Sequence, residues 1–98
     1  MLRCEEKIIC HRAIETFGKS SQMVVAIEEC SELQKELTKT LRGKPNLFNL
    51  SEEIADVEIM IEQLKIIFNN ADEVESIKET KFQRLNRTIK KVNKTEIL

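Results

Sequence analysis

The stretch LSEEIADVEIMIEQLKIIF, residues 50–68, decides the fold class, because its apolar side chains recur with the period of an α-helix. At about 100° per residue, Glu53 falls inside the apolar stripe and Asp56 lies at its edge, whereas Glu58 points to the opposite side. An unpaired carboxylate is expensive to bury. Glu53 and Asp56 are therefore misplaced for solubility alone and indicate a functional site. The predicted stripe consists of Leu50, Ile54, Val57, Met60, Ile61, Leu64 and Phe68.

A second acidic stretch, EECSE at residues 28–32, repeats the same spacing about twenty residues earlier. Residues three apart on a helix share a face, with Cβ atoms roughly 5–6 Å apart. Two such helices packed antiparallel would bring two carboxylate pairs together, and that density of negative charge favours a hard divalent cation such as Mg²⁺. The predicted metal ligands are Glu29, Glu32, Glu53 and Asp56.

The segment that carries the earlier acidic stretch is predicted to have an apolar face and a separate acidic face. Glu29 flanks the apolar stripe, Glu32 and Glu36 continue around from it, and Glu28 projects away. The apolar stripe consists of Met23, Ala26, Ile27, Cys30, Leu33, Leu37 and Leu41.

The composition predicts one all-α domain over residues 1–98, with a core at about 4–91. Two Gly, one Pro and four Phe with no Trp or Tyr favour helices packed through aliphatic side chains. A domain of this size has little core of its own, and apolar residues also lie outside the main stripes. We therefore expect a homo-oligomeric helical bundle, a dimer or a tetramer. The additional apolar residues are Val24, Val25, Ile59 and Ile66.

Four helices are predicted. The first covers about 4–17 and ends at Gly18; Ser20 or Ser21 caps the second, which runs to Leu41. Residues 42–46 form a loop, interpreted either as a solvated turn or as a lid over the acidic helices. The third helix begins at Asn49, with Glu52 in capping-box position, and runs to about Asn69. Asp72 and Glu75 form a second cap pair, the last helix covers 73–91, and 92–98 are predicted to fray.

Residues 78–94 carry seven bases and one acid. Lys78 and Lys81 fall within the apolar stripe of the last helix, and Arg84 lies on its shoulder. One interpretation is that these long side chains extend from an apolar face to water; the other is that they bind substrate phosphates. Overall acidity and the absence of interleaved aromatic residues argue against a nucleic-acid partner.

Three cysteines leave an odd thiol in any disulfide scheme, which favours reduced thiols in a cytoplasmic protein. Cys10 and His11 are adjacent and diverge by about 100° on a helix, so a shared zinc ion is disfavoured. The first residues lack the apolar run of a signal peptide, and no segment is apolar over a membrane-spanning length. We expect no membrane partner.

Three motifs together resemble one enzyme family. They are Phe17-Gly18 followed by Gln22, then AIEECSEL at residues 26–33, and then EEIADV at 52–57. This combination resembles the MazG-like all-α nucleoside triphosphate pyrophosphohydrolases, and the similarity extends to about Arg87. Phe17 stands where many members have Trp, a departure that bears on base stacking.

The resemblance implies a magnesium-dependent hydrolase, with Mn²⁺ as an alternative ion, that cuts the α–β phosphate bond of an NTP or dNTP to give a monophosphate and pyrophosphate. It implies catalytic roles for Glu28, Glu29 and Glu32. It also implies a homo-oligomer whose site is completed at a subunit interface. Lys81, Arg84 and Leu85 match a K-x-x-R-L pattern of the family. Together with Lys78, which is assigned from its place in the apolar stripe, the predicted substrate-binding residues are Gln22, Lys78, Lys81 and Arg84.

Two alternatives stay open. Phosphoribosyl-ATP pyrophosphohydrolase shares both acidic signatures, although Gln22, six residues before Glu28, is more similar to the MazG-like group. The other alternative is a non-enzymatic helical dimer, an adaptor module whose acids and bases form interhelical salt bridges. The base and sugar of a nucleotide substrate do not follow from the sequence.

Overall fold

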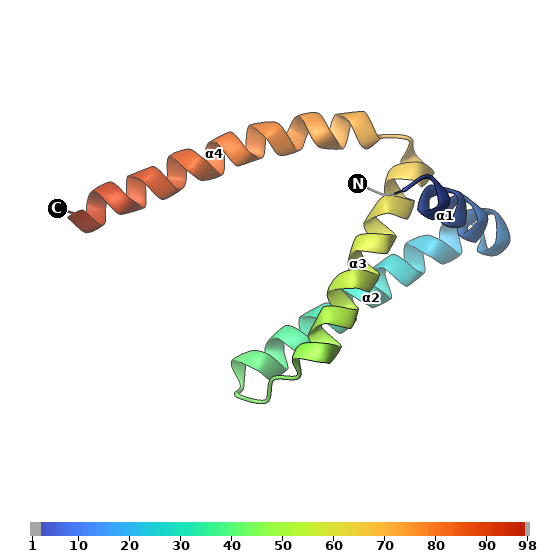
Figure 1. Cartoon of the computed structure of the whole chain (residues 1–98), viewed down its shortest axis with the longest axis horizontal. Coiled ribbons are helices and arrows are strands. Elements are labelled where there is room, and N and C mark those ends of the chain that lie inside the picture. Colours follow the sequence, from blue (N-terminus) through green and yellow to red (C-terminus); the bar gives the residue numbers. More distant parts are fainter. Residues whose placement is uncertain (1–2, 98) are drawn as a thin grey trace.

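The computed structural model describes residues 3–97, and within that range the chain is all-α with four helices and no strand (Figure 1). The prediction of an all-helical chain is confirmed. The helices are α1 (Cys4–Phe17), α2 (Lys19–Leu41), α3 (Leu47–Phe68) and α4 (Ala71–Ile97).

A single residue, Gly18, joins α1 to α2. The Gly18 backbone N–H donates to the Ile14 carbonyl (2.8 Å), and the Gly18 carbonyl accepts a hydrogen bond from the backbone N–H of Gln22 (3.1 Å). Its φ of 93° is a conformation that glycine adopts without steric cost. The prediction that Ser20 or Ser21 caps α2 is therefore wrong, because both residues already lie inside the helix.

The third helix begins earlier than predicted. Asn46 is its N-cap, and the Asn46 side-chain oxygen accepts a hydrogen bond from the Asn49 amide (3.0 Å). Asn49 and Glu52 are thus inside α3, and the predicted capping box is wrong. Two asparagines three residues apart can both cap, and the first one does.

The fourth helix is longer than predicted at both ends. Asn69, in the left-handed conformation (φ 50°, ψ 45°), ends α3, and the Asn70 carbonyl accepts from the Val74 amide (2.9 Å). Asp72 therefore lies in the first turn of α4, where an acid favours the helix dipole, and does not cap it. Fraying from residue 92 is also wrong for the described residues, because nothing there breaks the helix before 97; residue 98 lies outside the described range.

The helices α2 and α3 form an antiparallel hairpin, and α1 packs on both of them at the end away from the 42–46 loop (Figure 1). Within the described range, α4 packs only against α3, near the turn that joins them, and then extends away from the hairpin. The chain measures 57 × 37 × 23 Å along its principal axes. The four helices thus form a three-helix body and an arm.

The hydrophobic core of the described residues is small and consists of Cys10, Ile14, Ala26 and Met60. The predicted apolar stripes of α2 and α3 point only partly inward: Ile27 is 71% exposed and Leu41 is 88% exposed. Polar residues are buried in their place. The contact between α2 and α3 therefore follows the boundary between the apolar and acidic faces of each helix, which brings acids into the interior.

No described helix combines the length and the apolar character needed to cross a membrane. The three cysteines are free thiols; Cys10 is buried, and Cys4 and Cys30 are exposed. His11 is exposed.

Candidate metal centre

Three of the four predicted metal ligands meet between α2 and α3. Glu29 extends from α2, and Glu53 and Asp56 extend from successive turns of α3. One carboxylate oxygen of each lies within 4.8 Å of the other two. The hairpin creates this cluster because Glu53 and Asp56 share a face of α3 that the α2–α3 contact turns toward Glu29.

The pKa of Glu29 shows how strongly the carboxylates of the cluster interact. Burial, followed by the charges of Asp56 and Glu53 and hydrogen bonding with both, raises the pKa of Glu29 to about 7. Ionising all three carboxylates at once is unfavourable without a compensating charge. At neutral pH the cluster of a metal-free chain therefore holds a proton for part of the time.

Glu53 provides the observation that connects this cluster to a cation. Its Oε2 atom is buried and has no hydrogen-bond partner. A buried acceptor without a donor is costly, and a bound cation would satisfy it. Sequence periodicity placed Glu53 inside an apolar stripe, and the side chain is half-buried, as that placement predicts.

The donor set fits a hard divalent ion. All three groups are carboxylates, the ligands that Mg²⁺, Mn²⁺ and Ca²⁺ prefer. Oxygens on opposite sides of a Mg²⁺ ion lie about 4.2 Å apart. Adjacent oxygens around the same ion lie about 3 Å apart, so the three oxygens of the cluster, which lie within 4.8 Å of one another, would have to move closer together to bind one Mg²⁺ ion.

The structure does not bring Glu32 into this cluster. Glu32 and Glu28 are exposed on α2. Glu36, one turn further along α2 from Glu32, is buried and pairs with Lys39 (Nζ to Oε2, 3.3 Å). The four acids of α2 thus comprise one residue in the carboxylate cluster, one ion-paired residue and two exposed residues.

Gln22, a predicted substrate-binding residue, lies buried in the hairpin. Its Nε2 donates to Oε1 of Gln63, which is also buried (2.6 Å). This bond joins α2 to α3 across 41 residues of sequence, so in this chain Gln22 acts first as a structural link. The sequence pattern does not mark Gln63 as a site residue, but its position on the same side of α3 as Met60 is consistent with burial.

The three predicted phosphate-binding bases lie on α4 and, within one chain, are not brought to the carboxylate cluster. Lys78 pairs with Glu75 on the same helix (3.6 Å). Lys81 and Arg84 line a separate hollow on α4 together with Ser76, Ile77 and Thr80. The arm carries all three away from α2 and the middle of α3 (Figure 1).

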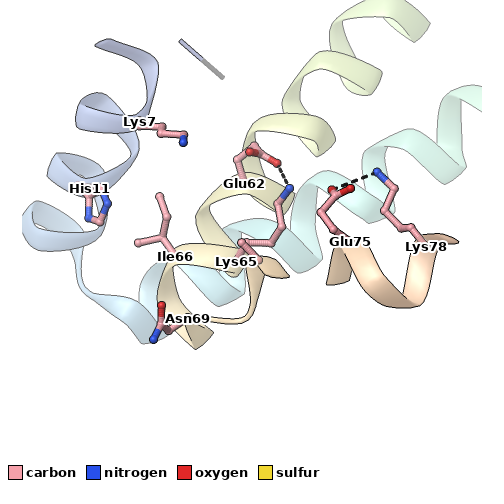
Figure 2. A pocket seen from close by; sticks show the side chains of 9 residues that line it. Lys7, His11, Glu62, Lys65, Ile66, Asn69, Glu75 and Lys78 are labelled. Carbon is pink, nitrogen blue, oxygen red and sulfur yellow. Dashed lines mark ion pairs between the residues drawn. The ribbon is translucent and has the colours of Figure 1, made fainter. Parts of the chain in front are cut away.

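A larger hollow of about 740 Å³ lies in the angle between α1, the end of α3 and the start of α4. Figure 2 shows Lys7 and His11 on α1 facing the Glu62–Lys65 ion pair on α3 and the Glu75–Lys78 pair on α4. Two of its three lysines are neutralised by these pairs, and the three clustered carboxylates are not among the residues that line it. Nothing in the sequence pattern pointed to this hollow, since its residues come from three helices.

Comparisons with protein-family models, with curated proteins and with solved structures found no match for this chain.

Proposed function

We propose that this protein is a magnesium-dependent nucleoside triphosphate pyrophosphohydrolase that cleaves the α–β phosphate bond. The proposal rests on the Glu29, Glu53 and Asp56 cluster, in which three carboxylates meet between two helices and the buried Oε2 atom of Glu53 has no hydrogen-bond partner. The resemblance to the MazG-like family, based on the motifs at residues 26–33 and 52–57, supports the same reaction.

Glu29, Glu53 and Asp56 would hold the ion, with Mn²⁺ as an alternative to Mg²⁺. A bound Mg²⁺ neutralises phosphate charge and makes water more acidic. In hydrolysis, water attacks the α-phosphorus, the bond from that phosphorus to the bridging oxygen breaks, and pyrophosphate leaves with the bond electrons. A carboxylate must accept the proton of the water.

Glu29 and Glu32 are the candidates for this base. The pKa of about 7 describes Glu29 in the metal-free chain; a bound cation would lower this pKa and favour the ionised carboxylate that accepts a proton. Glu32 is exposed one turn away on the same helix. Glu28, which matches the leading acid of the family motif, has an assigned role only through that resemblance.

We further propose that the active enzyme is a homo-oligomer. Lys78, Lys81 and Arg84 would bind substrate phosphates, yet in a single chain α4 carries them away from the cluster. A neighbouring copy is the simplest source of bases for this site. A cytoplasmic location fits both the nucleotide substrate and the free thiols.

The test is a screen of NTPs and dNTPs with Mg²⁺, measuring pyrophosphate and orthophosphate separately. The proposal expects pyrophosphate and a nucleoside monophosphate from at least one substrate. A nucleoside diphosphate with orthophosphate would place the cleavage at the wrong bond. If only phosphoribosyl-ATP is hydrolysed, the enzyme belongs with the histidine-pathway alternative, and if nothing is hydrolysed the non-enzymatic adaptor is favoured.

A further inference from the structure

The α2–α3 hairpin has an uncovered apolar face. A groove of about 510 Å³ runs between the two helices. Ile27 and Phe68 on its walls are largely exposed, and so are Leu37 and Ile61, which continue the apolar face beyond the groove. The apolar residues that line the groove are Met23, Ala26, Ile27, Cys30, Leu64 and Phe68.

The α4 arm has an uncovered apolar stripe of its own. Phe82, Leu85, Ile89 and Val92 follow a 3-4-3 spacing and are between 49% and 64% exposed. This is the spacing of a helix that packs along one seam against other helices. Among the described residues, α4 contacts only α3, near its own first turn, so the stripe has no partner within the chain.

The exposed area is too large for a folded monomer of this size. The chain exposes 8264 Å², whereas a monomer of 11.4 kDa exposes about 5,800 Å². Its radius of gyration is 17.3 Å, against about 12.6 Å for a compact chain of this length. The difference of about 2,500 Å² per chain is about 5,000 Å² for two chains, at the upper end of the total area that obligate dimers bury.

The charges of the helices and the apolar surfaces left exposed distinguish the possible pairings of two copies. Residues 80–94 contain six bases and no acid. Counted from the sequence, α2 and α3 together contain nine acids and four bases, a net charge of −5. Pairing α4 with α4 of a second copy would align two basic segments and leave both hairpin grooves open. Pairing hairpin with hairpin would leave both α4 stripes exposed.

We propose that two copies of this chain exchange their α4 arms, so that the Phe82–Val92 stripe of each copy packs in the α2–α3 groove of the other. This pairing covers both apolar surfaces in one two-fold arrangement and places a basic helix against an acidic hairpin. It rests on the homo-oligomer of the proposed function and not on the hydrolytic activity.

Cysteine crosslinking tests the pairing directly, because Cys30 already lies in the groove. In a Cys4→Ser background, single variants Phe82→Cys, Leu85→Cys, Ile89→Cys and Val92→Cys are treated with a short bismaleimide. At least one should give a covalent dimer on denaturing gels, beyond any seen in the Cys4→Ser parent. The matched Cys30→Ser versions should lose it. A dimer that survives Cys30→Ser indicates α4–α4 pairing and overturns the proposal, as does a crosslink that forms only within one chain.

Light scattering provides the second test. Leu85→Asp places a charge in the stripe, whereas Gln83→Asp adds the same charge on the opposite side of α4. Leu85→Asp should weaken dimerisation at least tenfold, and Gln83→Asp should leave it within about twofold. A wild-type chain that is monomeric at micromolar concentration, or equal effects of the two variants, would contradict the exchange. Neither test measures activity, so the exchange of the α4 arms can be confirmed even if the protein is inactive.

Discussion

The α2–α3 hairpin and the α4 arm use their apolar residues in opposite ways. The hairpin turns carboxylates and glutamines inward and leaves much of its apolar stripe exposed. The arm carries its bases and its apolar stripe along one helix and leaves both exposed. A fold selected for stability alone would bury the stripes. The proposed metal site would account for the polar interior of the hairpin, and the proposed arm exchange would account for its exposed apolar face.

Within the α2–α3 hairpin, we expect substitution of Glu53 to have the largest effect on activity. Glu53→Gln keeps the shape of the side chain and removes its charge, so the site loses an ionic ligand. We expect the pyrophosphohydrolase activity to fall by about 100-fold or more, since changing even groups that only support a metal ligand costs about 10–100-fold. Steady-state kinetics with Mg²⁺ measures the loss.

Glu58→Gln is the matched control for Glu53→Gln. It makes the same change at an exposed position of α3 outside the cluster, and should leave the activity unchanged. Equal activity in the wild type and Glu53→Gln would remove Glu53 from the site.

Glu29 makes the stability of the metal-free hairpin depend on pH. Its folded-state pKa of about 7 lies above its ordinary value of 4.5, so the folded chain binds more protons between these values. The contribution of Glu29 to the free energy of unfolding is fully present below about pH 4.5 and is lost as the pH rises through about 7. The slope approaches about 1.4 kcal/mol per pH unit between them.

Thermal melting in chelator from pH 5 to pH 8 measures this loss. The wild type should lose more stability over that range than Glu29→Gln does, while Glu58→Gln should follow the wild type. A parallel pH dependence in wild type and Glu29→Gln would show that the three carboxylates do not interact as the structure places them.

The Gln22–Gln63 bond gives the smallest expected effect. Gln63→Ala leaves the buried Gln22 amide without its partner, and we expect a loss of about 1–3 kcal/mol in unfolding free energy. Replacing both residues with leucine removes both polar groups and should restore most of the stability. Urea unfolding measures both variants. If the double variant is the less stable of the two, the pair does more than satisfy two buried amides.

The helices and part of the site could be predicted because both depend on local periodicity. The pattern in residues 50–68 identified α3, and the position of Glu53 within it marked the cluster. Helix starts were less predictable where two capping residues compete, as Asn46 and Asn49 do.

The rest depends on how the helices pack, which periodicity does not determine. The orientation of α2 about its own axis places Glu29 in the cluster and leaves Glu32 exposed. The same orientation buries Gln22 and exposes Ile27. The direction of α4 depends on the turn at Asn69 and Asn70.

Comparing the melting midpoint in Mg²⁺ or Mn²⁺ with the midpoint in chelator tests most directly whether Glu29, Glu53 and Asp56 bind a divalent cation. An ion bound only by the folded state raises the midpoint by mass action, about 2.7 kcal/mol at 100 times Kd. We predict such a rise for wild type and Glu58→Gln and none for Glu53→Gln, which in chelator should be as stable as wild type or more so, because repulsion is relieved. No rise in the wild type, together with a clear loss of stability for Glu53→Gln in chelator, would show that this carboxylate holds the fold together and binds no metal.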